Sequence, residues 1–246
     1  MRAILVPAPG GPEALVLGDA PDPQPRAGEV IVRVRAAGVN RADLLQAAGK
    51  YPPPPGASEI LGLEAAGETE DGKRVFFLLP GGGYAEKVAV PAGMLMPMPD
   101  GMSFEDAAAI PEAWFTAYLN LFREGGLKSG ERALVHAAAS GVGTAAIALA
   151  RRAGAVAIGT TRSAAKAEAV TKLGADLVVD TSAGSFLTAI EERFGKNAVD
   201  VVLDPVGGSV FADDVKTLAM GGRLVLIATM GGASAEIDLR AVLSRR

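Results

Sequence analysis

The stretch from Val135 to Ala155 holds the residues best suited to chemistry in this sequence. It reads VHAAASGVGTAAIALARRAGA and places Ala138, Ser140 and Gly143 at the spacing of G-x-G-x-x-G, the turn that binds a dinucleotide pyrophosphate. Ala and Ser are the smallest replacements for glycine, so a phosphate can still approach the backbone if φ stays negative at both positions. The alternative is that the small residues only allow a helix to pack tightly.

The start of the helix after this turn supplies the phosphate donors. The candidates are the backbone N–H groups of Ser140, Gly141, Val142 and Gly143. The first N–H groups of a helix lack intrahelical partners, and the helix dipole favours an anion there. We therefore expect all four groups to face a pyrophosphate.

A second polar group follows the next apolar run, about 20 residues after the turn. An NAD site would place Asp or Glu there to hold the ribose hydroxyls, whereas hydroxyls and cations suit the 2′-phosphate of NADP(H). The segment GTTRSAAK supplies Thr160, Thr161, Arg162, Ser163 and Lys166, with no carboxylate before Glu168. This pattern favours NADPH, although Ser163 would also cap the following helix and Lys166 would also suit a solvated surface.

Composition excludes several kinds of chemistry. The chain has no Cys and one His, which removes disulfides, thiolate catalysis and zinc sites built from Cys or paired His. His136 lies in the apolar run ALVHAAA, where we expect a packed, hydrogen-bonded side chain; a Ser-His-Asp site would rest on it alone. A net charge of -4 without basic clusters argues against nucleic acid. No apolar run is long enough to span a membrane, so we expect a cytoplasmic protein.

Residues 1–112 have the pattern of a β-rich domain. Short apolar or alternating runs at 2–6, 29–38, 73–79 and 84–90 predict strands, separated by Gly- and Pro-rich turns. One helix is expected over 40–49, with Asn40 as its N-cap and Gly49 as its end.

Residues 113–246 have the pattern of a parallel α/β domain. Two helices meeting near Pro111 lead into it, with Ser103 and Asp106 as a partial capping box. Strands at 132–138, 155–161, 176–180, 199–204 and 222–229 alternate with helices at 141–153, 163–173, 185–194 and 209–219. Apolar strands separated by helices predict a parallel sheet covered on both faces. A dinucleotide fold needs a sixth strand, and the residues after 229 are too few for one, so we expect C-terminal truncation and an exposed outermost strand.

Several segments together resemble a known family. They are GVNRADLLQAAGKYPPPPGASEILGLEAAGE, LPGGGYAEKVAVP, AAIPEAWFTAYLNL, GERALVHAAASGVGTAAIALARRAGA and LDPVGGS. In this order they resemble the zinc-free, zeta-crystallin-like quinone oxidoreductases of the medium-chain dehydrogenase/reductase superfamily. The resemblance implies a GroES-like catalytic domain at 1–112 and a Rossmann domain at 113–246, with NADPH in the cleft between them. It also implies hydride transfer to quinones, or to activated alkenes in relatives, and a homodimer.

The resemblance assigns roles to individual residues. Asn40 and Tyr51 would be catalytic, and Asn40 and Thr116 would lie near the nicotinamide. Ser140, Gly141, Val142 and Gly143 would hold the pyrophosphate. The remaining cofactor contacts would be Thr161, Arg162, Ser163, Lys166, Thr181, Val206, Gly207, Met230 and Gly231. Without the resemblance, Asn40 would be read as a helix cap and Tyr51 as an aromatic packed on PPPPG.

The sequence departs from the family pattern in three places. Thr181 stands where the family often has Tyr beside the 2′-phosphate, which would weaken NADPH affinity or selectivity. The segment between Glu64 and Val75 is shorter than in most relatives. The last Rossmann strand and the segment that returns to the catalytic domain have no counterpart.

Two other functions fit the same residues. Reduction of enones or alkenals would use the same hydride geometry on carbon, and an NADPH-binding protein with little turnover would need only the cofactor site. Turnover of a quinone against an enone separates the first from quinone reduction. Quenching of NADPH fluorescence without oxidation would indicate the second.

Overall fold

The computed structural model describes residues 1–245 and divides the chain into two units, Met1–Glu112 and Ala113–Arg246. Arg246, the last residue of the expected second domain, lies outside the described residues. No helix within the described part is long and apolar enough to cross a membrane.

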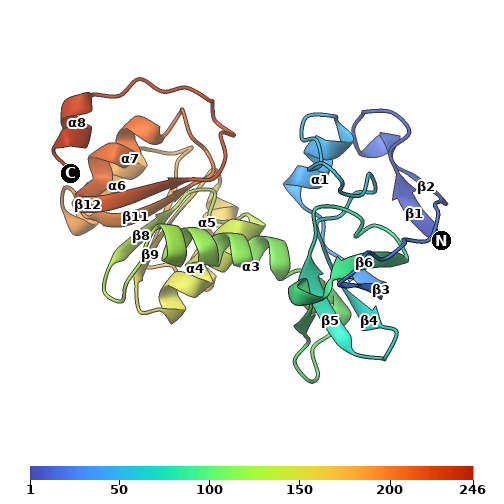
Figure 1. Cartoon of the computed structure of the whole chain (residues 1–246). Helices are drawn as coiled ribbons and strands as arrows, with labels where there is room; N and C mark the ends of the chain where they lie inside the picture. Colours follow the sequence, from blue (N-terminus) through green and yellow to red (C-terminus); the bar gives the residue numbers. More distant parts are fainter. Residues whose placement is uncertain (246) are drawn as a thin grey trace. The chain divides into compact units, whose positions relative to one another are not determined.

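The first unit is built on antiparallel strands (Figure 1). Its five-stranded sheet has the order β6-β3-β4-β5-β7, and β1 and β2 form a separate antiparallel pair. The strands are β1 (Arg2–Leu5), β2 (Val16–Asp19), β3 (Glu29–Ala37), β4 (Glu64–Thr69), β5 (Arg74–Leu78), β6 (Lys87–Pro91) and β7 (Met96–Pro97). The helices are α1 (Arg41–Ala47) and α2 (Phe104–Ala108).

Most of this unit follows the sequence pattern. The four predicted strands and the helix after Asn40 are present, and Gly49 at the end of that helix has a left-handed φ of 69°. The sequence analysis missed β2, β4 and β7. The omission of β4 matters most, because this central strand carries a buried carboxylate, Glu64, beside the helix that starts after Asn40.

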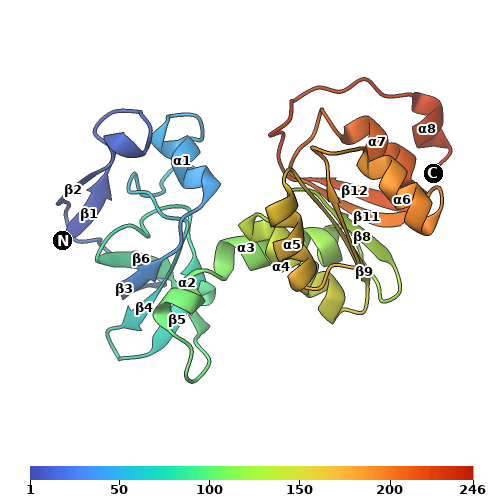
Figure 2. The same ribbon diagram turned by 180° about the vertical axis from the view of Figure 1, so that it is seen from behind.

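The second unit contains a parallel sheet with helices on both faces (Figures 1 and 2). Its order is β10-β9-β8-β11-β12, with β12 at one edge as expected of the fifth strand. The strands are β8 (Arg132–Val135), β9 (Val156–Thr161), β10 (Leu177–Asp180), β11 (Val199–Asp204) and β12 (Leu218–Leu226). The helices are α3 (Pro111–Tyr118), continued by a π-helical segment (Leu119–Glu124), α4 (Gly141–Arg152), α5 (Ala164–Lys172), α6 (Phe186–Phe194), α7 (Phe211–Thr217) and α8 (Leu239–Leu243).

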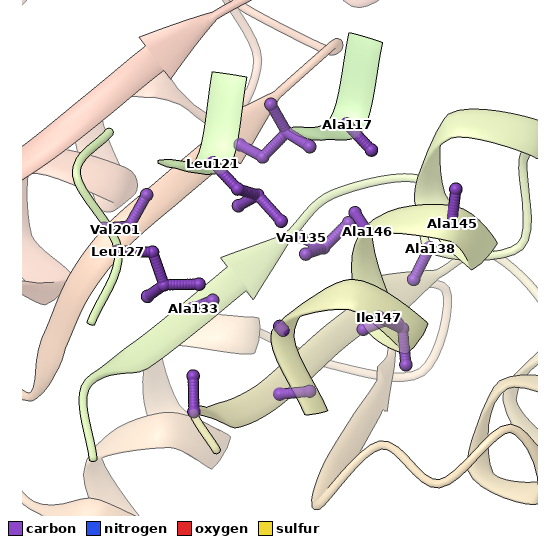
Figure 3. Packing of buried hydrophobic residues seen from close by; sticks show 14 of the residues in the cluster. Ala117, Leu121, Leu127, Ala133, Val135, Ala138, Ala145, Ala146, Ile147 and Val201 are labelled. Carbon is purple, nitrogen blue, oxygen red and sulfur yellow. The ribbon is translucent and has the colours of Figure 1, made fainter. Parts of the chain in front are cut away.

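Alternate residues of β8 enter two different cores. Ala133 and Val135 pack with Ala146 and Ile147 of α4, and Figure 3 shows this cluster, whereas Leu134 packs with residues of α6 on the other face. Burial on both faces explains why the strands are apolar throughout.

The largest difference between predicted and observed boundaries in this unit lies between α7 and β12, where the strand expected over 222–229 runs from Leu218 to Leu226. The helix expected over 209–219 ends at Thr217, and β12 begins at Leu218. The pairing of β12 with β11 is irregular: Leu218 pairs with Val199, and Arg223 pairs with Val201. Residues 219–222 of β12 therefore lie between these two pairs without a paired residue of their own on β11. The sequence pattern had placed the first of them, Ala219, in the preceding helix.

Candidate active site

The predicted cofactor residues of the second unit follow the carboxyl ends of its strands. The strand order reverses direction between β8 and β11, and open α/β sheets bind their ligands at such a switch point. After β8 come Ser140, Gly141, Val142 and Gly143. Thr161 is the last residue of β9, and Arg162, Ser163 and Lys166 follow it. Thr181 follows β10, Val206 and Gly207 follow β11, and Met230 and Gly231 follow β12. The fold thus places all of them at one edge of the sheet.

The turn between β8 and α4 is closed by hydrogen bonds at both ends. The N–H of Ser140 donates to the carbonyl of Ala137 at 2.8 Å, and the N–H of Ala138 donates to the carbonyl of Thr160 at 2.9 Å. Ala137 has a left-handed φ of 49°, which costs a residue other than glycine about 1–2 kcal/mol. Neither Ala138 nor Ser140, the two positions that replace glycine, has a positive φ, as the sequence argument required.

Only part of the expected set of phosphate donors is free. The N–H of Ser140 is used within the turn, and the N–H of Gly143 donates to Oγ of Ser140 at 3.0 Å. The expectation that all four N–H groups face a phosphate is therefore wrong, because Ser140 caps the helix itself. Within residues 1–245, the N–H groups of Gly141 and Val142 have no protein acceptor.

Gly143 fills the place of the third glycine for a steric reason. A Cβ at this position would lie 2.6 Å from Cα of Ala138 and closer still to the carbonyl oxygen of Ala137. A Cβ on Gly141 would meet only Cβ of Ala113 at 3.7 Å, an ordinary contact. The close approach of helix to turn therefore depends on Gly143 and not on Gly141.

The polar group after β9 offers two cations. Arg162 and Lys166 are exposed, and neither forms an ion pair within the described residues. Oγ of Ser163 accepts from the N–H of Lys166 at 3.4 Å, so Ser163 caps α5 as the alternative reading expected.

Thr181 joins the ends of two strands. Its N–H and its hydroxyl both donate to the carbonyl of Thr161, each at 2.8 Å. A hydroxyl has one hydrogen, so this one is not available to donate to a ligand, although its oxygen can still accept. Thr181 therefore positions the end of β9.

The segments after β11 and β12 are bonded to each other. The N–H of Gly231 donates to the carbonyl of Val206 at 2.6 Å, and the N–H of Met230 donates to the carbonyl of Pro205 at 3.2 Å. The fully buried carboxylate of Asp204 accepts from the N–H groups of Val206 and Gly207. These two N–H groups are consequently committed to the protein.

Thr116 lies on α3, whose start approaches the cofactor turn through the contact between Ala113 and Gly141. Its carbonyl accepts from Nδ2 of Asn120 at 2.8 Å. No hydrogen bond joins Thr116 to the other predicted cofactor residues within residues 1–245.

In the first unit, Asn40 is held by two acidic residues. Its backbone N–H donates to Oδ2 of Asp43 at 2.8 Å, and its Nδ2 donates to Oε1 of Glu64 at 2.8 Å. The other carboxylate oxygen of Glu64 accepts from the N–H of Glu112 at 2.8 Å. One amide hydrogen of Asn40 is thus used, and the second remains available for a ligand.

These two acidic residues are buried and lie near one another. Asp43 is 2% exposed and Glu64 is 3% exposed, and neither forms an ion pair within residues 1–245. The pKa of Glu64 lies above its usual value. Burial is the largest cause of this rise, and it outweighs the hydrogen bonds to Glu112 and Asn40, which lower the pKa. Burial and the nearby Glu64 and Asp43 charges also raise the pKa of Glu112. Burial and the 2.8 Å hydrogen bond to Asp43 raise the pKa of Tyr84, which therefore stays protonated.

Tyr51 has a different position. Its side chain is 48% exposed, and no hydrogen bond joins it to Asn40 in the described part of the chain. The neighbouring proline residues Pro54 and Pro55 line a hollow of about 400 Å³, but neither Tyr51 nor Asn40 lines it. The two predicted catalytic side chains are thus not joined by a hydrogen bond within residues 1–245.

His136 is packed and hydrogen-bonded, as predicted. It is 1% exposed, with Nδ1 2.8 Å from Oγ1 of Thr160 and Nε2 2.6 Å from Oδ1 of Asp214. Its ring meets the ring of Phe186 edge-on at 4.9 Å between centroids.

Several polar residues near the predicted site were not predicted from the sequence: Asp43, Glu64, Tyr84 and Glu112 in the first unit, and Asp204 and Asp214 in the second. Charged residues inside apolar runs were the available signal, as in LGLEAAG and VDVVLD. For Tyr84 and Glu112 no such signal exists, since their importance comes from neighbours distant in sequence.

The second unit fits a dinucleotide in three respects. In the described part of the chain, the N–H groups of Gly141 and Val142 at the start of a helix have no protein acceptor, and the cations Arg162 and Lys166 form no ion pair. Gly143 keeps the turn free of a Cβ. Within residues 1–245, no three His, Cys, Asp or Glu side chains are grouped so that they could hold a metal ion.

Known families match both parts of the chain. Residues 26–100 match the alcohol dehydrogenase GroES-like domain, and residues 141–246 match the zinc-binding dehydrogenase domain. The rat quinone oxidoreductase is 32% identical over the whole chain, which covers 78% of the rat protein. The chain belongs to the medium-chain dehydrogenase/reductase superfamily. Its fold is accordingly a β-rich GroES-like domain with a parallel-sheet Rossmann domain.

Other relatives of this superfamily member show the same similarity. The quinone oxidoreductase of Thermus thermophilus, solved alone and with NADPH, superposes with a TM-score of 0.85 at 37% identity, covering 100% of this chain and 77% of that one. The synaptic vesicle membrane protein VAT-1 homolog of Mus musculus is 35% identical over 92% of this chain. The chain spans only 58% of the length of that mouse protein. The similarity thus establishes the superfamily and its two-domain fold.

Proposed function

We propose that this superfamily member is an NADPH-dependent quinone oxidoreductase that works without a metal. The observation that carries the cofactor assignment is the pair of exposed cations, Arg162 and Lys166, after β9, where an NAD site would hold a carboxylate. Quinone as the substrate is supported by the rat and Thermus relatives.

The residues of the second unit bind and orient the cofactor. The N–H groups of Gly141 and Val142 would bind the pyrophosphate, and Arg162 and Lys166 would bind the 2′-phosphate. Thr161 and Ser163 shape the turn that carries these cations, and Thr181 holds it to β10. Bound NADPH supplies a hydride.

The residues of the first unit would act on the quinone. A quinone is already electrophilic, so its reduction needs donors for the developing oxyanion more than a strong acid. The second amide hydrogen of Asn40 is suited to this role because Glu64 holds the amide in place. The Tyr51 hydroxyl is exposed and free of intramolecular partners in the described residues, so it can also donate to a carbonyl oxygen.

The test is to measure oxidation of NADPH and of NADH by a small quinone and by an enone. We expect quinone-dependent oxidation with kcat/KM at least tenfold higher for NADPH than for NADH. Tighter binding of NADH would overturn the cofactor assignment, and faster turnover of the enone would replace the quinone. Quenching of NADPH fluorescence without oxidation would indicate a binding protein. If Tyr51→Phe and Asn40→Ala both keep the original kcat/KM, the assignment of their roles is wrong.

A further inference from the structure

Three buried side chains form a hydrogen-bonded chain beneath the cofactor turn. Asp214 of α7, His136 after β8 and Thr160 of β9 are 0%, 1% and 4% exposed. They are linked by distances of 2.6 Å from Oδ1 of Asp214 to Nε2 of His136 and 2.8 Å from Nδ1 of His136 to Oγ1 of Thr160. Their burial keeps them from touching a ligand, so any effect on binding must act through the backbone.

Thr160 forms hydrogen bonds to the residues on both sides of Ala137. Its hydroxyl meets the ring of His136, the residue before Ala137, and its carbonyl accepts the N–H of Ala138, the residue after it. Ala137 is thus fixed between two contacts to one neighbour. It is also one of only two residues other than glycine with a positive φ among residues 1–245.

The strained residue controls the geometry of the phosphate donors. The carbonyl of Ala137 accepts the N–H of Ser140, and Gly143 packs against this carbonyl. Ser140 is the N-cap of α4, so its position sets the direction of the N–H groups of Gly141 and Val142. A relaxed Ala137 would move the carbonyl that anchors the whole turn.

His136 is itself held by hydrogen bonds to Leu203 and Asp214. Its backbone N–H donates to the carbonyl of Leu203 at 3.1 Å, and Asp214 holds the ring nitrogen opposite Thr160. The ring therefore has a single position, from which Nδ1 can meet the Thr160 hydroxyl.

We propose that Thr160 and His136, with Asp214 orienting the ring, are positioning residues that hold Ala137 in its left-handed conformation and so preset the turn for the cofactor. The inference rests on the proposed binding of NADPH at this turn. It adds a role for residues that contact neither cofactor nor substrate.

The test compares Thr160→Val with a matched control, Thr217→Val. Val replaces a hydroxyl by a methyl group of similar size, and Thr217 is a buried residue whose hydroxyl donates to the carbonyl of Asp214 at 2.7 Å within α7. Both variants lose one buried hydrogen bond of the second unit, but only Thr160→Val removes a contact to the turn. We expect both to lower the melting temperature by similar amounts.

Cofactor affinity should separate the two variants. In titrations followed by NADPH fluorescence, we expect Thr160→Val to raise Kd at least fivefold and Thr217→Val to leave it within twofold. Thr160→Ser, which keeps the hydroxyl, should bind like the original chain. Adding Ala137→Gly to Thr160→Val should restore Kd to within twofold, because glycine adopts a positive φ without the hydroxyl contact that the variant loses. An unchanged Kd in Thr160→Val, an equal rise in Thr217→Val, or no rescue by Ala137→Gly would overturn the inference.

Hydrogen exchange tests the same idea without the cofactor. Amide exchange of the peptide spanning 136–143 should be faster in Thr160→Val than in Thr217→Val, and equal exchange would overturn the inference. If the original chain fails to bind NADPH, the proposed function is wrong, while the exchange measurement still decides whether Thr160 holds the turn.

Discussion

Oε1 of Glu64 accepts a 2.8 Å hydrogen bond from Nδ2 of Asn40, so a buried carboxylate that forms no ion pair within residues 1–245 fixes the amide proposed to act on the substrate. The same carboxylate accepts the N–H of Glu112. Two donors, one on each oxygen, explain how a carboxyl group is accommodated at 3% exposure. They also leave the orientation of the Asn40 amide dependent on Glu64.

We therefore predict that Glu64→Ala lowers kcat/KM for the quinone by about tenfold, since an unfixed amide and an unpaired Glu112 N–H together cost about 1–3 kcal/mol. Steady-state kinetics on protein with a retained melting transition measures this effect. Glu70→Gln, an exposed position just after the same strand, is the control and should be unchanged. A folded Glu64→Ala protein with the original kcat/KM would show that Asn40 needs no support.

Most of the second unit could be predicted from the sequence. Apolar runs separated by helical segments indicate a parallel sheet whatever the details of packing, and β8 to β12 all lie within or next to their predicted ranges. The strand β4 could not be found this way. Its sequence, EAAGET, has little β propensity, and it is a strand because it pairs with β3 and β5.

The site shows the same division. The cofactor turn was recognisable from its small residues and their spacing, but the sequence placed the conformational demand at Ala138 and Ser140. The structure places it at Ala137, because two contacts to Thr160 act on either side of that residue. Contacts between distant segments set this φ, and no local pattern encodes them.

Glycine substitutions should distinguish the two glycines of the turn. We predict that Gly143→Ala destabilises the protein by about 1–3 kcal/mol, as overpacking typically does, because its Cβ would collide with the backbone of Ala137 and Ala138. It should also abolish measurable NADPH binding. Gly141→Ala meets only an ordinary contact with Ala113 and serves as the control, with little change in melting temperature. Equal tolerance of both substitutions would refute this account of the turn.

Removing the cations after β9 should change cofactor preference more than overall binding. In the double variant Arg162→Ala with Lys166→Ala, we predict that Kd for NADPH rises at least tenfold while Kd for NADH stays within threefold, because only NADPH carries the 2′-phosphate. Fluorescence titration with both nucleotides measures the ratio. Lys172→Ala is a suitable control, since Lys172 pairs with Glu168 on the exposed side of α5. A parallel loss of both nucleotides would mean that these cations do not recognise the 2′-phosphate.

The buried Asp214 should give the protein a distinctive dependence of stability on pH. Burial raises the pKa of Asp214 to about 6, against the partly opposing hydrogen bond and charge of His136, and its Oδ2 has no partner in the described part of the chain. Because the folded pKa is above the unfolded value of 3.8, the folded state binds the proton more tightly. The stabilising contribution is therefore fully present below about pH 4 and is lost as the pH rises through about 6.

We predict that Asp214→Asn removes this loss. Urea unfolding at intervals from pH 4.5 to 7.5 should show the free energy of unfolding of the original chain falling relative to Asp214→Asn by about 1–3 kcal/mol as the pH rises. Asp213→Asn is the control, because Asp213 is partly exposed beside Lys216 and its charge is the smallest of the causes that raise the pKa of Asp214, so its loss should change the slope between pH 4.5 and 7.5 far less than Asp214→Asn does. A constant difference between the original chain and Asp214→Asn would show that Asp214 does not take up a proton in this range and would overturn the prediction.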